Sequence, residues 1–454
     1  MPIIGGRQIG VRGLGFQGAG KPSVPTSVSA TDVGTARAFN NGAATVSWTA
    51  PSSNGAPISS YTVTSSPGSF TATTSSTSVQ VTGLQSSTSY TFTVTATNAV
   101  GTSDASSASS SITATTVPQA PTIGTASKGS SLGQILVAYT AGATGGKAVS
   151  AYTATSSPGS ITAAGASPIS VTGLTEGSSY TFTVTATNDN GTSSASSASN
   201  SVAAPTLLTQ TFNSSTTWAA PSTLNSVEAL VIAGGGGAGG SGYYPRGHHG
   251  QAAIGGGGGA GGLVYASALP ISGGTTYNIT IGNGGNTGPN SVAPTNNTTQ
   301  GNNGGNSVFH NLTAQGGGYG GTASYTLGAE GGSGGSGGGA GNAAAATQPR
   351  KNGGSSTQGN FANATGYGFS GGSAASNGNF TTVGGGGGGG AGGAGGNGEN
   401  NSVVGTPGAG RTYFGTTYAY GGGGGGANNT GTPKGTGGNG AAGQPGTIIL
   451  RYIG

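Results

Sequence analysis

Ionisable side chains are scarce in this sequence of 454 residues: only 4% are charged, against about a quarter in a typical soluble domain. Cysteine is absent, which excludes disulfides and thiolate metal sites. The net charge is +5, but the basic residues are too scattered to form the clustered surface that nucleic acid requires. No segment approaches the roughly 20 apolar residues of a membrane span, and no standard secretory signal opens the chain. We therefore expect neither a nucleic-acid partner nor a membrane span.

Groups that carry catalysis are equally sparse. Acid–base catalysis needs a positioned titratable pair, and the seven carboxylates are spread singly along the chain. Glu330 and Glu399 would have to lie about 5–10 Å apart to act as a glycosidase pair, and two solvated loop charges are the simpler interpretation. The glycine runs contain phosphate-loop patterns, but no strand–loop–helix context accompanies them. We expect no enzymatic activity, no cofactor and no metal site.

An internal repeat organises the first half of the chain. VTGLQSSTSYTFTVTATNAVGTS from Val81 recurs as VTGLTEGSSYTFTVTATNDNGTS from Val171, 90 residues later. A unit of about this length is one β-sandwich domain. Within it, Tyr90 to Ala96 alternates apolar side chains with threonines, which predicts a strand with one face in a core and one in water.

Both repeats resemble the fibronectin type III family, over about residues 23–116 and 117–207. The likeness rests on an early-strand aromatic, a tyrosine strand and a Leu-x5-Tyr element: Trp48 (with Tyr139 in its place in the second repeat), Tyr61, Leu84 to Tyr90, and Leu174 to Tyr180. The resemblance implies seven strands per repeat, rigid spacing and a frequent role in adhesion. It also implies that the last tyrosine of each element bonds to upstream backbone.

Glycine dominates the second half, where 77 of the 101 glycines lie in residues 208–454. No G-X-Y period is present, so collagen is excluded. The glycines form four solid runs: Gly234–Gly237, Gly255–Gly259, Gly384–Gly390 and Gly421–Gly426. Strand-like segments lie between and after the runs: Val227–Ile232, Thr276–Ile281 and Thr447–Tyr452.

Two structures fit such runs. A flexible linker or silk-like tract is one, because fixing a glycine backbone is entropically costly. The other is an ordered lattice, in which helices with three residues per turn and no internal hydrogen bonds pack side by side and bond laterally. The strands between the runs favour the lattice. We therefore predict polyglycine-II helices with loops at their ends.

The glycine-rich half looks like a domain family of bacterial viruses that is common in tail fibres and receptor-binding proteins. The segments that carry this likeness are TQTFNSSTTWAAPSTLNSVEALVIAGGGGAGG from Thr209, GGAGGLVYASALPISGGTTYNITIGNGG from Gly258, and the ending GQPGTIILRYIG. It implies a fibre or adhesin subunit on the virion surface (capsid or tail fibre) that attaches to a host glycan or outer-membrane protein. A decoration protein with a purely structural role is the alternative. Fibres of this kind are often homotrimers, although no heptad or β-helix pattern here demands one.

The first 22 residues form a glycine-containing arm without helical propensity. Such an arm is either frayed or an anchor that binds other virion proteins, and we favour the anchor. Its candidate contact residues are Ile3, Ile4, Arg7, Ile9, Val11, Arg12, Leu14 and Phe16.

Candidate recognition residues lie in the glycine-rich half, because aromatic and arginine side chains are enriched in binding hot spots. They are Tyr243, Tyr244, Arg246, His248, His249, Arg350, Lys351, Arg411, Tyr413, Phe414, Tyr418 and Tyr420, with Phe361 to Phe369 as a further aromatic loop. The YYPRGHHG loop remains open between recognition, an inert loop and, given a third ligand, a metal site. Aromatics in a glycine scaffold either pack or contact a ligand.

The sequence thus predicts an all-β chain with essentially no α-helix. We expect an arm at 1–22, immunoglobulin-like fibronectin III sandwiches at 23–116 and 117–207, and a glycine-rich domain of short strands and polyglycine-II helices at 208–454.

Overall fold

The computed structural model describes residues 18–243, 252–253, 255–289, 291–292, 299–323, 328–341, 351–374, 382–383, 385–398, 405–418 and 442–454. The chain divides into two compact units, Met1–Thr206 and Leu207–Gly454. All regular elements of the described residues are β-strands, which confirms the predicted all-β class. None of these residues belongs to a helix that is long and apolar enough to cross a membrane.

The first unit contains two sandwiches of the same design, each made of a three-stranded and a five-stranded antiparallel sheet. In the first, the sheet orders are β1-β2-β5 and β4-β3-β6-β7, with β8 also on β6. Its strands are β1 (Thr26–Val33), β2 (Gly42–Thr49), β3 (Ile58–Ser66), β4 (Thr71–Thr74), β5 (Ser78–Leu84), β6 (Ser89–Asn98), β7 (Gly101–Thr102) and β8 (Ile112–Thr113).

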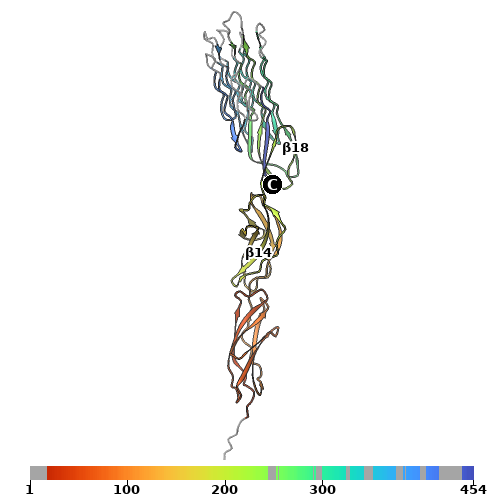
Figure 1. Cartoon of the computed structure of the whole chain (residues 1–454), viewed down its shortest axis with the longest axis vertical. Helices are drawn as coiled ribbons and strands as arrows, with labels where there is room; N and C mark the ends of the chain where they lie inside the picture. Colours follow the sequence, from red (N-terminus) through yellow and green to blue (C-terminus); the bar gives the residue numbers. More distant parts are fainter. Residues whose placement is uncertain are drawn as a thin grey trace, which may run out of the picture. The chain divides into compact units, whose positions relative to one another are not determined.

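The second sandwich repeats these orders as β13-β10-β9 and β12-β11-β14-β15, with β16 also on β14; β14 is labelled in Figure 1. Its strands are β9 (Thr122–Lys128), β10 (Ile135–Thr140), β11 (Val149–Ser157), β12 (Thr162–Ala164), β13 (Ile169–Val171), β14 (Ser179–Asn188), β15 (Gly191–Thr192) and β16 (Val202–Ala203).

Period-two alternation places the apolar residues of β6 and β14 in the two cores, as predicted. Trp48 lies 5.2 Å from Tyr61 between ring centroids. The Tyr90 hydroxyl accepts the Gln85 N–H at 3.0 Å, and Tyr180 does the same for Thr175 at 3.0 Å. Both tyrosine corners implied by the family resemblance are therefore formed.

The last strand of each sandwich is interrupted, so the structure has eight strands per repeat where the resemblance implied seven. Between β7 and β8, three buried serines replace a regular ladder on β6: Ser103, Ser106 and Ser109. At Ser106, the N–H donates to the Val94 carbonyl at 3.0 Å, and the hydroxyl oxygen accepts the Val94 N–H at 2.9 Å. The serines are three residues apart, whereas their partners on β6 are two residues apart. The two spacings fit together because each serine bonds to both the N–H and the carbonyl of its partner.

Replacing Ser106 by alanine should leave the buried Val94 N–H without an acceptor. We expect the free energy of unfolding to fall by about 1–3 kcal/mol, measured by urea denaturation of the full chain. Ser107→Ala is the matched control, because the Ser107 side chain is exposed and its change should stay within about 0.5 kcal/mol. Equal effects of the two variants would contradict this role for the serine ladder.

Within the first unit, the two sandwiches meet through a hydrogen-bonded joint. The Asp32 carboxylate of β1 accepts the Thr115 N–H at 3.0 Å and the Thr115 hydroxyl at 2.5 Å. The Asn190 amide donates to the Thr115 hydroxyl oxygen at 2.8 Å, and the Ala36 N–H donates to the Asn190 carbonyl at 2.8 Å. A side chain at Gly34 would collide with Thr115 and Asn190. The joint is therefore specified by side chains of both repeats.

The second unit is built on two antiparallel sheets, β17-β31-β19-β22-β27 and β18-β23-β25-β26. Their strands are β17 (Leu207–Phe212), β18 (Thr216–Ala219), β19 (Ser226–Ile232), β22 (Leu263–Pro270), β23 (Thr276–Thr280), β25 (Ser307–Phe309), β26 (Leu312–Ala314), β27 (Thr365–Tyr367) and β31 (Thr447–Ile453). The remaining strands are β20 (Gly242–Tyr243), β21 (Ala252–Ala253), β24 (Ser291–Val292), β28 (Thr382–Val383), β29 (Arg411–Tyr413) and β30 (Thr416–Tyr418).

The sheet that contains β19 is buried on both faces, which explains the continuous apolar run in that strand. Val227 and Val231 pack with Trp218 and Phe309 in the core between the two sheets. Leu230, on the opposite face of β19, belongs to a second cluster with Leu263, Ile449 and Tyr418 of β30. These two clusters form the base from which the glycine segments extend.

Strands of the base continue directly into glycine segments, which lie side by side in the second unit (Figure 1). We call these segments the glycine lattice: residues 233–240, 255–262, 282–288, 301–306, 315–322, 331–341, 352–355, 369–374, 385–398, 405–410 and 442–446. The run at 421–426 and Gly384 lie outside the described residues.

Hydrogen bonds in the lattice recur every third residue. The Gly236 N–H donates to the Gly259 carbonyl at 2.9 Å, and three residues on, the Gly239 N–H donates to the Gly256 carbonyl at 3.0 Å. Gly256 and Gly259 in turn donate to the carbonyls of residues 321 and 318, at 2.8 and 2.7 Å. Lateral bonds at this period are those of a helix with three residues per turn. The predicted polyglycine-II arrangement is confirmed for these segments.

Glycine is required in the lattice because of space rather than backbone conformation. Gly256 is not among the residues with positive φ, so an L-amino acid could adopt its backbone angles. A Cβ on Gly256 would instead overlap the carbonyl oxygen of Gly339, and one on Gly259 would overlap that of Ser336. The neighbours are backbone atoms held by their own hydrogen bonds, so they cannot move aside as a side chain would.

Candidate functional site

An aromatic hairpin covers the outer face of the five-stranded sheet of the second unit. Strands β29 and β30 pair antiparallel, and Phe414 and Gly415 form the two-residue loop between them. Both have positive φ, 52° and 77°, as the hairpin turn type demands. A bulky aromatic is a rare choice for such a position, and its strain costs about 1 kcal/mol or more. The strain points to a requirement for the Phe414 ring at this place.

The hairpin rings gather with two tyrosines of neighbouring sheet strands, β22 and the edge strand β27. The Tyr413 ring centroid lies 4.5 Å from that of Tyr265 on β22 and 6.4 Å from that of Tyr367 on β27. Phe414 lies 6.3 Å from Tyr413. All four rings are only partly buried, so they form an ordered aromatic surface.

Charged groups hold this surface in place. Arg451 lies directly opposite Glu228 in the pairing of β31 with β19, and its guanidinium nitrogen is 3.2 Å from the carboxylate. The Tyr265 hydroxyl donates to the same carboxylate at 2.5 Å. Arg451 also lies over the Phe414 ring, 4.4 Å from its centroid. We name the set Glu228, Tyr265, Tyr367, Arg411, Tyr413, Phe414 and Arg451 the aromatic cluster.

Arg411 makes the closest cation–π contact of the aromatic cluster, 3.7 Å from the Tyr367 ring centroid. Such a stack fixes the ring and the guanidinium together. Burial, followed by a hydrogen bond with the Tyr367 side chain, raises the pKa of Tyr413, although Arg411 opposes the change. Burial and the hydrogen bond to Glu228 raise the pKa of Tyr265 to about 12. Tyr265 and Tyr413 are therefore neutral hydrogen-bonding groups at neutral pH.

The raised pKa of Tyr265 predicts a loss of stability in alkali. An unfolded tyrosine titrates near pH 10, so between about pH 10 and 12 the unfolded state releases a proton that the folded state retains. This contribution is complete below pH 10 and is lost as the pH rises. Between pH 10 and 12, we expect the free energy of unfolding of Tyr265→Phe to fall less steeply with pH than that of wild type. The difference in slope should correspond to the release of about one proton on unfolding. Parallel curves from urea titrations at several pH values would refute this expectation.

A shallow pocket of about 480 Å³ opens beside the cluster. Its lining comes from two strands and one turn: Tyr265 and Ser267 of β22, Tyr367 of β27, and the turn from Asn360 to Thr365. The turn is closed by hydrogen bonds between Phe361 and Ala364, 2.9 and 3.3 Å long. The lining contains no Asp, Glu, Lys, Arg or His, and the walls combine aromatic rings with amide and hydroxyl groups.

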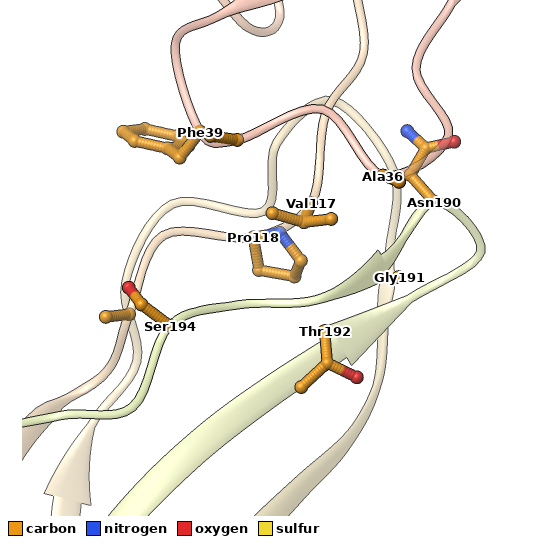
Figure 2. Close-up of a pocket in the computed structure, with 10 residues that line it drawn as sticks. Ala36, Phe39, Val117, Pro118, Asn190, Gly191, Thr192 and Ser194 are labelled. Atoms are coloured by element: carbon orange, nitrogen blue, oxygen red, sulfur yellow. The ribbon is translucent and has the colours of Figure 1, made fainter.

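A second pocket, of about 400 Å³, lies at the joint of the first unit. Figure 2 shows Pro118 beside Val117 among the lining residues, with Asn190 and Thr192 on the β14–β15 hairpin. None of its lining residues titrates, and Asn190 already serves the joint. We therefore assign this pocket to the joint between the sandwiches.

The structure brings together some of the predicted recognition residues. Arg411, Tyr413 and Phe414 belong to the aromatic cluster, whereas Tyr418 is 8% exposed and packs in the core. Lys351 is partly buried, and its carbonyl accepts the Ala374 N–H at 3.0 Å.

Of the YYPRGHHG loop, only Tyr243 is placed, by its backbone in β20. Tyr244, Arg246, His248, His249, Arg350 and Tyr420 lie outside the described residues, as do Glu399, Ile3, Ile4, Arg7, Ile9, Val11, Arg12, Leu14 and Phe16. Those predictions stand as predictions.

Sequence reasoning missed Glu228, Tyr265 and Arg451, which lie on strands that looked purely structural. The sequence did contain one signal for the ion pair of Glu228 with Arg451. Glu228 and Arg451 are single, opposite charges, each inside an otherwise apolar strand, and a charge in such a place is usually paired.

Comparison with known proteins assigns the two halves of the chain. Residues 209–453, more than half of the chain, match the glycine-rich domain family. The chain belongs to the glycine-rich domain family. Residues 23–113 of this glycine-rich domain protein match the fibronectin type III domain, and the second sandwich shares the sheet order of the first. Together the two families indicate a structural or adhesive protein.

Likeness to individual proteins is weak. No curated protein matches the glycine-rich domain protein. Among solved structures, the FN1-FN3 domains of chicken CNTN1 match at 16% identity over 58% of this chain and 93% of that one, with a TM-score of 0.26. Titin kinase with its flanking domains matches at 19% identity over 27% of this chain and 28% of that one, with a TM-score of 0.18. Neither likeness bears on function.

Proposed function

We propose that the chain is a fibre or adhesin subunit of a virion surface, on a capsid or tail fibre, which presents its glycine-rich domain to a host. The observation that supports this most is the three-residue hydrogen-bond period of the glycine lattice. Backbone bonds convert segments with few side chains into an ordered body, and an ordered body can present loops in fixed positions. A bacterial surface glycan or outer-membrane protein is the partner that we propose.

The fibronectin III sandwiches serve as spacers in this proposal. Their joint is hydrogen-bonded through Asp32, Thr115 and Asn190, which suits a stiff support rather than a loose tether. The proposal includes no enzymatic step. Two of the described carboxylates, Asp32 and Glu228, already bind structural partners.

Cell binding tests the display function. Fluorescently labelled full chain is incubated with a panel of bacterial cells and compared with a chain that ends at Thr206, the limit of the first compact unit. We expect the full chain to bind at least one strain saturably and the shortened chain to bind none. Equal binding by both would overturn the assignment of recognition to the glycine-rich domain. Full chain that binds no cells but associates tightly with particles would establish the structural decoration role instead.

The proposed anchor has a separate test. Residues from Gly20 onward are held by the first sandwich, since the Gly20 N–H donates to the Asn54 carbonyl at 2.8 Å. Deletion of residues 1–17 therefore spares that contact. We expect the truncated chain to remain folded but to be lost from assembled particles, as measured by immunoblotting of purified virions. Normal incorporation of the truncated chain would refute the anchor.

A further inference from the structure

The pocket beside the aromatic cluster has the composition of a carbohydrate subsite. The apolar C–H face of a pyranose packs on aromatic rings, and its hydroxyls pair with amide and hydroxyl groups. Tyr265 and Tyr367 supply rings, while Ser267, Asn363 and Thr365 line the same pocket and are exposed. Within the described part of the chain, no hydrogen-bond partner is found for the side chains of Ser267, Asn363 or Thr365.

The pocket is preorganised, which lowers the entropic cost of binding. Phe361 and Ala364 pack against the core of the base, and these contacts fix the turn between them. The Asn360 side-chain oxygen accepts the Gly366 N–H at 2.9 Å, which ties the turn to β27. On the strand side, the hydrogen bond to Glu228 fixes Tyr265.

Charge narrows the ligand class. Every side chain that lines the pocket is uncharged, and the nearby Arg451 is already paired with Glu228. Arg411 is stacked on the Tyr367 ring, so it acts as a positioning residue for that ring. An anionic ligand would lose hydration in this pocket without gaining a free cationic partner. A neutral sugar carries no charge that needs such a partner.

We propose that this pocket binds one neutral pyranose residue of a host glycan, stacked on the tyrosine rings and hydrogen-bonded by Asn363 and Ser267. The inference rests on the proposed display function and gives it a site at the base of the glycine-rich domain. A uronic acid should bind no better than the matching neutral sugar.

Calorimetric titration of the full chain with maltotriose, chitotriose and trigalacturonate tests the proposal. We expect at least one neutral trisaccharide to bind. Asn363→Ala should weaken that binding about 5-fold through loss of a hydrogen bond, and Tyr367→Ala about 10-fold or more through loss of stacking. Tyr367→Phe should retain most of the affinity because it keeps the ring. Asn302→Ala, an exposed asparagine of the lattice, is the matched control and should bind like wild type.

Three results would decide against the pocket as a sugar site. Absence of binding to both neutral sugars, preference for trigalacturonate, or full affinity in Asn363→Ala and Tyr367→Ala would overturn it. Circular dichroism and thermal unfolding confirm that each variant is folded. If the full chain binds cells and Tyr367→Ala binds them equally, the subsite fails while the display function stands. If the full chain binds a neutral sugar and the variants weaken that binding as expected, but the full chain binds no cells, the subsite stands and the display function fails.

Discussion

Replacing Gly256 by alanine is expected to lower the free energy of unfolding of the glycine-rich unit by about 3 kcal/mol or more. The new Cβ would overlap the Gly339 carbonyl oxygen. Relief requires one lattice segment to move, and each segment is bonded to several others: Gly256 donates to Gly321, and Gly339 donates to Gly257. A loss of this size should lower the melting temperature by about 6–12 °C for a unit of this length. Trp218, in the core of the same unit, reports unfolding by fluorescence.

The control is Gly359→Ala in the same unit. A Cβ on Gly359 meets nothing within 4 Å, and its φ is not positive. Alanine there reduces the freedom of the unfolded chain, so we expect no loss and a gain of up to about 1 kcal/mol. If Gly256→Ala and Gly359→Ala had the same effect on stability, that result would contradict close backbone packing as the reason for glycine in the lattice.

Asn98→Ala should be the most damaging single substitution in the first sandwich outside its apolar core. The Asn98 side chain, 4% exposed, donates to the carbonyls of Gly20, Ser53 and Ala56 at 2.8, 3.0 and 3.3 Å. Its oxygen accepts two backbone N–H groups, one of them from Val100 at 2.9 Å. Alanine leaves these groups without partners, and we expect a loss of about 2–4 kcal/mol.

Urea denaturation in a Trp218→Phe background isolates the first sandwich, because Trp48 is then the remaining tryptophan. The adjacent Thr97→Ala is the control. The Thr97 hydroxyl makes one exposed contact, with Thr102 at 3.0 Å, and its removal should cost less than about 0.5 kcal/mol. A loss below 1 kcal/mol in Asn98→Ala would show that the loops it joins are held by other contacts.

The sandwiches were predictable because their sequence signals are local. Alternation in Tyr90 to Ala96 sets one strand and its buried face, and Leu84 to Tyr90 carries a corner that depends on five residues of separation. The serine ladder was not predicted. Its three-residue spacing has meaning only beside β6, and a serine-rich segment alone reads as a loop.

The lattice was predictable in kind but not in arrangement. Solid glycine runs between apolar strands leave few ordered structures, and the three-residue period follows from glycine chemistry. Which segment bonds to which depends on the base, where β19, β22 and β31 lie side by side and direct their continuations together. Nothing in the runs themselves encodes that order, since one glycine is like another.

The aromatic cluster illustrates the same limit for the site. Arg411, Tyr413 and Phe414 stand out as a dense group in a polar segment, so composition alone selects them. Tyr265 and Glu228 lie on strands made mainly of apolar residues, and only cross-strand register places them under the hairpin. Tertiary pairing, rather than residue type, decides which aromatics form a surface.

Amide hydrogen exchange across the lattice tests the central claim most directly. The N–H groups of Gly236, Gly239, Gly256 and Gly259 each donate to a carbonyl of another segment. Mass spectrometry of peptides that cover 234–240 and 255–262 in the intact protein should show protection comparable to that of β19, because opening one segment requires opening its neighbours. Exchange at the rate of an unstructured peptide, with β19 still protected, would contradict an ordered lattice and with it the proposed display of a host-binding surface.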